Sequence, residues 1–156
     1  MKVLFMCTAN SCRSILSEAV FNHLAPPGFE AISSGSFPKG QVLPRSLSTL
    51  QAAGISIDGL YSKGNDAFEG HPPDVVITVC DKAAGEACPV YFGPALKAHW
   101  GLEDPSDLQA DDAAVEAAFK ATLDIIASRC QAFFALPFAR LSPAELKIEL
   151  DRIARL

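Results

Sequence analysis

The sequence lacks long hydrophobic runs, an excess of positive charge and an even number of cysteines. Its N-terminal apolar run, residues 3–6, is far shorter than the roughly 18 residues that a membrane span needs, and no signal-peptide core accompanies it. Thirteen lysines and arginines against eighteen acidic residues give a net charge of −5, which repels phosphate backbones. Five cysteines are more typical of a reducing compartment than of disulfide staples. We therefore expect a cytoplasmic protein with no membrane or nucleic-acid partner.

The apolar residues that are present suffice for one compact domain, because hydrophobic side chains make up 49% of 156 residues. Continuous apolar runs at residues 1–6 and 74–79 predict strands that are covered on both faces. Further strands are predicted at residues 29–33 and 95–100, and helical patterns at residues 14–24, 44–53 and 111–134. Strands that alternate with helices predict an open α/β sheet with right-handed crossovers.

The last twenty residues carry a helix signal of their own. Residues 142–145 (SPAE) match a capping box with proline at the first helical position. One face of the following helix is apolar, at Leu146, Leu150 and Ile153. We predict a domain of residues 1–136 and a C-terminal helical extension of residues 137–156 that packs on or beside it.

The segment between the first strand and the first helix, residues 7–14 (CTANSCRS), holds the sharpest chemical signal. A loop that closes at a helix N-terminus presents unpaired N–H groups and the positive end of the helix dipole, which suits a tetrahedral oxyanion. Arg13 adds a planar fork for two oxygens, and the same field favours the thiolate of Cys7 as a nucleophile. The Ser14 hydroxyl can donate to that sulfur, and Asn10 tolerates a left-handed backbone. The predicted oxyanion-binding residues are Thr8, Ala9, Asn10, Ser11, Cys12, Arg13 and Ser14.

This segment resembles the phosphate-binding loop of the low-molecular-weight protein tyrosine phosphatases and of the arsenate reductases that share their fold, and the resemblance covers residues 1 to about 134. It implies a four-stranded parallel sheet flanked by helices, Cys7 as nucleophile and Arg13 as oxyanion clamp. It also implies a general acid from an Asp-Pro pair, here Asp104-Pro105. Taken without the resemblance, Asp104 is one of several acids in a turn-forming stretch.

The two branches of that family differ after the first attack: a phosphatase needs water, and a reductase needs more thiols. Cys80 follows the strand at residues 74–79, at the same sheet edge as Cys7, and Cys88 lies eight residues on. Similarity to the thioredoxin-coupled reductases implies that Cys7 attacks arsenate, Cys80 attacks Cys7, and Cys88 resolves to a Cys80–Cys88 disulfide. A dithiol donor, thioredoxin or glutaredoxin, would then reduce that disulfide, with no bound cofactor.

Geometry constrains that pairing. Eight residues of helix would separate Cys80 and Cys88 by roughly 12 Å, whereas a disulfide needs Cα atoms within about 7 Å. The segment must therefore be looped or must unwind on oxidation, and Gly85 offers the permissive backbone. Residues 98–105 (AHWGLEDP) resemble the reductase branch, and Ser106 and Asp107 replace the aromatic residues that wall phosphotyrosine in the phosphatases.

Other interpretations stay open at this point. A phosphatase would act through Cys7, Arg13 and Asp104 alone, and a non-catalytic oxyanion or thiol sensor would use the C-terminal helix as a partner surface. Phosphate and sulfate are expected to compete with arsenate because they share its shape and charge.

A metal site is not expected, because Cys80 and Cys88 lack C-x-x-C spacing and His71 and His99 are scattered in the sequence. Some related reductases hold a monovalent cation near the loop through residues that correspond to Asn10 and Glu18. Here Lys63 stands where a further acid would be expected, which puts that cation in doubt. The remaining cysteines, Cys12 and Cys130, are interpreted as buried thiols.

Overall fold

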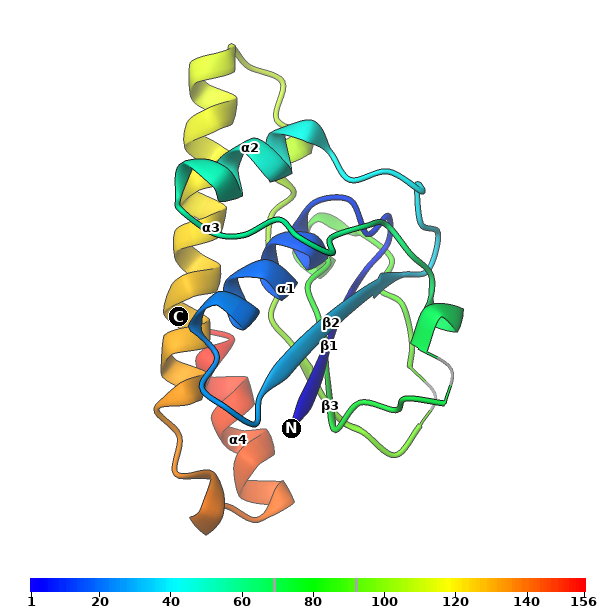
Figure 1. The fold of residues 1–156 in the computed structure, drawn as a ribbon, viewed down its shortest axis with the longest axis vertical. Coiled ribbons are helices and arrows are strands. Elements are labelled where there is room, and N and C mark those ends of the chain that lie inside the picture. Colours follow the sequence, from blue (N-terminus) through cyan, green and yellow to red (C-terminus); the bar gives the residue numbers. More distant parts are fainter. Residues whose placement is uncertain (69, 92) are drawn as a thin grey trace.

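The centre of the molecule is a four-stranded, fully parallel sheet with the strand order β2-β1-β3-β4 (Figure 1). The structure is a computed structural model that describes residues 1–68, 70–91 and 93–156. All four predicted strands are found, as β1 (Lys2–Cys7), β2 (Glu30–Gly35), β3 (Val75–Thr78) and β4 (Leu96–His99). The predicted α/β class and the four-stranded sheet are confirmed.

The predicted helices are also found, with boundaries shifted by a residue or two. They are α1 (Arg13–Leu24), α2 (Pro44–Ala52), α3 (Asp112–Phe134) and α4 (Pro143–Ile153). Short 3₁₀ turns occupy Asn65–Phe68 (η1), Lys82–Ala84 (η2), Pro105–Asp107 (η3) and Phe138–Arg140 (η4). No helix among the described residues is both long enough and apolar enough to cross a membrane.

The two faces of the sheet are covered differently. Val3, Phe5 and Ile77 point toward the helices and join the main core, where Phe21 of α1 and Phe133 of α3 meet with ring centroids 5.4 Å apart. Strand residues that alternate with these point to the opposite face, where Leu4, Met6 and Val76 are buried beneath Tyr91 and Ala95. Both faces are therefore dry, which explains the continuous apolar runs in β1 and β3.

Helix α4 packs against the C-terminal half of α3 and beside β4 (Figure 1). Its predicted capping box is present, since Ser142 and Glu145 bond each other's backbone amides. Leu150 and Ile153 are fully buried, and the indole Nε1 of Trp100 donates to the Leu150 carbonyl over 3.0 Å. The helix thus completes the hydrophobic core next to the last strand.

Candidate active site

The loop of residues 7–14 joins β1 to α1 and turns its carbonyl groups outward. The carbonyl oxygens of Thr8, Ala9 and Ser11 accept backbone hydrogen bonds of 2.9–3.1 Å from the segment of residues 37–43. In a trans peptide the next N–H points away from the carbonyl, so the following amides face the concave side of the loop. An anion on that side of the loop can accept hydrogen bonds from these amides and from the N-terminus of α1.

Asn10 fixes the shape of this loop. It adopts the left-handed conformation that the sequence suggested, with φ of 47°. Its Nδ2 donates to Ser14 Oγ at 2.8 Å and to Ser33 Oγ at 3.0 Å, and its Oδ1 accepts from the Lys63 amide at 2.9 Å. Gly35 lets β2 approach, since a Cβ there would lie 2.9 Å from the Asn10 nitrogen. The hydrogen bonds of the Asn10 side chain therefore help to fix a loop that contains no glycine.

Cys7 lies at the carboxyl end of β1, nearly fully buried, with its Sγ 2.8 Å from Ser14 Oγ. Asn10 Nδ2 donates to Ser14 Oγ, which leaves the serine hydrogen available for another acceptor. A thiolate carries no hydrogen, so once Cys7 is ionised Ser14 is the donor of this bond. Ser14 thus offers a hydrogen bond to a Cys7 thiolate, as the sequence predicted.

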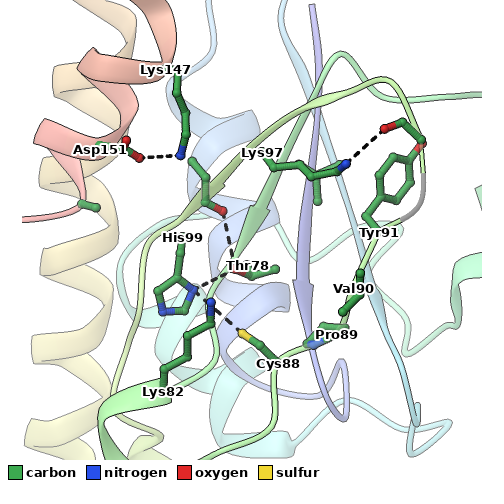
Figure 2. A pocket seen from close by; sticks show the side chains of 14 residues that line it. Thr78, Lys82, Cys88, Pro89, Val90, Tyr91, Lys97, His99, Lys147 and Asp151 are labelled. Atoms are coloured by element: carbon green, nitrogen blue, oxygen red, sulfur yellow. Dashed lines mark hydrogen bonds and ion pairs between the residues drawn. The ribbon is translucent and has the colours of Figure 1, made fainter. Parts of the chain in front are cut away.

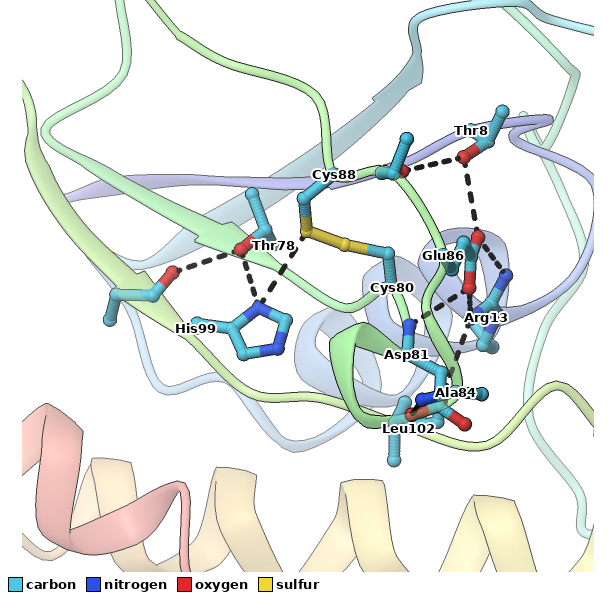
Figure 3. Close-up of a disulfide and its surroundings, with 12 residues drawn as sticks. Thr8, Arg13, Thr78, Cys80, Asp81, Ala84, Glu86, Cys88, His99 and Leu102 are labelled. Atoms are coloured by element: carbon cyan, nitrogen blue, oxygen red, sulfur yellow. Dashed lines mark hydrogen bonds and ion pairs between the residues drawn. A yellow bond between two sulfur atoms is a disulfide. The ribbon is translucent and has the colours of Figure 1, made fainter.

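Arg13 is the first residue of α1, and its guanidinium group binds Glu86, a partner that the sequence did not indicate. Its Nη1 and Nη2 bond the two carboxylate oxygens of Glu86 at 2.6 and 2.7 Å (Figure 3). Nη1 also donates to the Leu102 carbonyl at 3.2 Å. The guanidinium holds the pKa of Glu86 below its usual range, so that carboxylate is ionised at neutral pH. An arginine that is almost fully buried therefore carries a two-pronged bond to a carboxylate.

Asp104 lies beside the same guanidinium. Its Oδ2 is 3.5 Å from Arg13 Nη2, while its Oδ1 accepts from the amide and the hydroxyl of Ser106. These bonds make Asp104 the N-cap of η3, the short turn that begins at Pro105. The structure therefore brings the carboxylate of the Asp-Pro pair next to the loop's arginine.

Cys80 and Cys88 form a disulfide (Figure 3), with Cα atoms 5.8 Å apart. Cys7 is a free thiol. The chain between Cys80 and Cys88 is not a continuous helix. It makes the single turn η2, which ends at Gly85 with φ of 82°. The expectation of a looped segment with a permissive glycine agrees with this geometry.

The register of the sheet places Cys7 and Cys80 at the carboxyl ends of the neighbouring strands β1 and β3. Met6 of β1 pairs with Thr78 of β3, and the Val79 amide extends the ladder to the Met6 carbonyl at 2.9 Å. Cys7 is the residue after Met6, and Cys80 is the residue after Val79. Cys80 is completely buried behind the disulfide, and Cys88 is half-buried.

His99 is a second residue that sequence reasoning missed. Its Nδ1 lies 2.7 Å from Thr78 Oγ1 and 3.9 Å from Cys88 Sγ. The ligand atoms of Cys80, Cys88 and His99 all lie within 4.8 Å of one another, so the fold brings together in space a histidine and two cysteines that the sequence spacing did not connect. Burial lowers the pKa of His99 and favours the neutral ring. A neutral imidazole thus faces the sulfur of Cys88.

The side-chain ammonium group of Lys63 lies beside Glu18, where the sequence raised the question of a bound monovalent cation. Lys63 Nζ lies 3.3 Å from Glu18 Oε1, 3.2 Å from Ser33 Oγ and 2.9 Å from the Tyr61 carbonyl. The Lys63 and Glu18 side chains are only 6% and 11% exposed. The lysine supplies positive charge to the Glu18 carboxylate that supports the loop through Ser33 and Asn10.

Cys12 and Cys130 are both buried thiols. Burial raises the pKa of each to about 12, which keeps them protonated at neutral pH. Both residues match the expectation of buried thiols.

A pocket of about 860 Å³ opens beside the sulfur of Cys88 (Figure 2). Pro89, Val90 and Tyr91 form part of its wall together with His99. The side chains of three lysines also line it, Lys82, Lys97 and Lys147. Cys88 is thus approachable from outside through an apolar pocket with basic residues in its walls.

The family model of the low molecular weight phosphotyrosine protein phosphatases matches residues 2–149 of the chain. The chain belongs to this family. Within it, an arsenate reductase from Halalkalibacterium halodurans is 30% identical over 131 residues, which are 84% of this chain and 93% of the relative.

Solved structures of the family agree with the fold described above. An arsenate reductase in a phosphate-binding state is similar with a TM-score of 0.68 and 27% identity, over 86% of this chain and 96% of the other. A thioredoxin-dependent arsenate reductase from Corynebacterium glutamicum is similar with a TM-score of 0.61 and 27% identity, over 85% of this chain and 59% of the other.

Proposed function

We propose that the protein reduces arsenate to arsenite by a relay of three cysteines and is recharged by a dithiol donor. The observation that carries this proposal is the Cys80–Cys88 disulfide, whose loop contacts the arginine of the oxyanion loop. A phosphatase has no use for two further sulfurs at this edge of the sheet. The similar arsenate reductases give the proposal independent support.

The first half of the reaction uses the oxyanion loop. The inward-facing amides and Arg13 bind arsenate, and the Cys7 thiolate attacks the arsenic. A hydroxyl oxygen of the bound arsenate takes a proton from Asp104 and leaves as water, and a covalent Cys7–arsenic adduct remains. The Ser14 hydroxyl stabilises Cys7 as a thiolate before this attack and again when its sulfur leaves later.

The second half transfers two electrons. The Cys80 thiolate attacks the sulfur of Cys7, the sulfur–arsenic bond breaks, and its electron pair stays on arsenic, which departs as arsenite. The Cys88 thiolate then attacks Cys80, so that Cys7 is released as a thiolate and the disulfide moves to Cys80 and Cys88. The last of these states is the arrangement of bonds in this structure.

A donor dithiol closes the cycle by reducing Cys80–Cys88 and becoming a disulfide itself. We infer that it approaches through the pocket beside Cys88, where the apolar wall leaves the sulfur reachable. The similar Corynebacterium glutamicum enzyme is thioredoxin-dependent, which supports thioredoxin as the donor, and glutaredoxin is the alternative. Since the relay needs its cysteines as thiols, we infer a cytoplasmic location. Phosphate and sulfate are expected to compete for the loop.

The second candidate is a phosphatase of the same family. Its support is the adjacency of Arg13 and Asp104, which a phosphatase would use together with Cys7. In that case Cys80 and Cys88 would have a structural role only.

The decisive test is arsenate-dependent NADPH consumption with purified thioredoxin and thioredoxin reductase. We expect turnover by the wild type and its loss in Cys7→Ser, Cys80→Ser and Cys88→Ser. Cys130→Ser, which changes a buried thiol outside the site, is the control and is expected to turn over normally. Retained turnover in Cys80→Ser would contradict the relay. No turnover by the wild type with either thioredoxin or glutaredoxin would favour the phosphatase.

A further inference from the structure

The oxyanion clamp of this protein is engaged by one of its own carboxylates. Both terminal nitrogens of Arg13 bond Glu86, at 2.6 and 2.7 Å, and Thr8 Oγ1 donates to the same carboxylate at 3.3 Å (Figure 3). A carboxylate and a tetrahedral oxyanion both present two negative oxygens to a guanidinium fork. Glu86 therefore uses the donors of Arg13 that a bound oxyanion would use.

Glu86 is held in this position by the loop that the disulfide closes. The Asp81 amide donates to Glu86 Oε2 at 2.8 Å, and the Glu86 amide donates to the Asp81 carbonyl at 3.1 Å. Asp81 directly follows Cys80, and Glu86 stands two residues before Cys88. The bond between the two sulfurs thus limits the conformations of the segment that carries the carboxylate.

We infer that Glu86 is an intramolecular competitor of the oxyanion, and that the Cys80–Cys88 disulfide strengthens its hold on Arg13. The oxidised protein then binds oxyanions weakly and does not retain substrate that it has no thiols to reduce. Reduction by a dithiol donor adds two electrons and two protons to the disulfide and gives two thiols. The loop is then free to open, and the oxyanion can displace Glu86. This inference rests on the proposed function, which makes the disulfide a step of the cycle.

Thermodynamic linkage gives the inference a second consequence. If the oxyanion binds the reduced protein more tightly than the oxidised one, saturating oxyanion must favour reduction by the same factor. A tenfold difference in affinity corresponds to a rise of about 30 mV in the midpoint potential of the disulfide. Substrate would therefore promote the recharging of the enzyme that is about to use it.

The test is the dissociation constant of inorganic phosphate, measured by calorimetry for the oxidised and the reduced protein. We expect wild-type protein to bind phosphate about tenfold more weakly when oxidised. Glu86→Gln removes the competing charge and should strengthen binding by the oxidised protein, so that the two states become nearly equal. Glu103→Gln is the matched control, because it removes an exposed carboxylate next to Asp104, and it should keep the wild-type ratio. Glu86→Asp, which keeps the charge but shortens its reach, should shift affinity in the same direction as Glu86→Gln.

Equal phosphate affinities in the two redox states of the wild type would overturn the inference, as would a redox ratio that Glu86→Gln leaves intact. The same applies if neither state binds phosphate. A carboxylate that merely braces the loop would, on substitution, weaken binding or lower stability in both states. Phosphate binding needs no arsenate reduction, so the two proposals can fail separately. Arsenate turnover together with equal phosphate affinities in the two redox states would refute only the role of Glu86. A redox-dependent phosphate affinity without arsenate turnover would refute only the reductase function.

Discussion

Replacement of Ser14 by alanine removes the one hydroxyl that the structure aims at the sulfur of Cys7. The contact is 2.8 Å long, and Ser14 must be its donor when Cys7 is a thiolate, because a thiolate carries no hydrogen. Asn10 donates to the serine oxygen and leaves the serine hydrogen available. Asn10 keeps its second bond, to Ser33, in the variant, so the loop retains support. The substitution therefore acts mainly on the thiolate form of Cys7.

A hydrogen bond to a charged group contributes about 1.5–3 kcal/mol, so without it the conversion of the thiol to the thiolate becomes less favourable by a factor of roughly 10 to 150. A thiolate that is less stabilised is also a better nucleophile, with a Brønsted coefficient near 0.5, and this recovers about half of the loss on a logarithmic scale. We expect the alkylation of Cys7 by iodoacetamide to slow by about 3- to 12-fold at a pH low enough for the thiol to predominate in both proteins.

The oxidised protein isolates this reaction, because Cys80 and Cys88 are bonded and burial raises the pKa of Cys12 and Cys130 to about 12, which keeps both as unreactive thiols. Peptide mass spectrometry would follow the carbamidomethyl group on Cys7 over time. Ser17→Ala is the control: its hydroxyl is equally buried one turn along α1 but donates to the Arg13 carbonyl. An alkylation rate in Ser14→Ala equal to that of wild type would refute the proposed role of the serine.

Three further outcomes follow from the packing and the charges. Lys63→Met leaves the Glu18 carboxylate buried without its ammonium partner and should lower the free energy of unfolding by about 3–5 kcal/mol in urea titrations. Adding Glu18→Gln should restore part of that loss, and an unchanged unfolding midpoint in Lys63→Met would contradict the pairing. Leu150→Ala should cost about 2–5 kcal/mol in the same assay, against less than about 0.5 kcal/mol for the exposed Ile148→Ala, and equal losses would argue against a core role for α4. Folding lowers the pKa of Glu86, so its stabilisation is present above its ordinary value near 4.5 and is lost as the pH falls below it. The stability gap between the oxidised wild type and Glu86→Gln should therefore shrink from about pH 7 to about pH 3, and a constant gap would exclude an ionised pair.

The oxyanion loop could be predicted from sequence because its chemistry is local. A buried strand, the five connecting residues 8–12 and a helix start are contiguous, so the positions of Cys7, Arg13 and Ser14 follow from the order of the chain. The strands could be recognised because both faces of the sheet are dry, which makes β1 and β3 continuously apolar.

Glu86 and His99 escaped prediction because their contacts depend on tertiary geometry. Glu86 reaches Arg13 across 73 residues of chain, and only the path of the loop between the paired cysteines brings it there. His99 meets Cys88 because β4 pairs with β3 in a register that sets it beside Thr78. The spacing of the sequence motifs gives no signal for either contact. Recognising β3 and β4 as neighbouring strands would have suggested that His99 lies close to the cysteines that follow β3.

The most direct test of the three-cysteine relay is a single turnover without any electron donor. Fully reduced protein would be mixed with one equivalent of arsenate, followed by quantification of arsenite and by disulfide mapping with mass spectrometry. The relay predicts one arsenite per chain and a Cys80–Cys88 disulfide, and in Cys88→Ser one arsenite with a trapped Cys7–Cys80 disulfide. Absence of arsenite, or arsenite formed with Cys80 still a free thiol, would contradict the account.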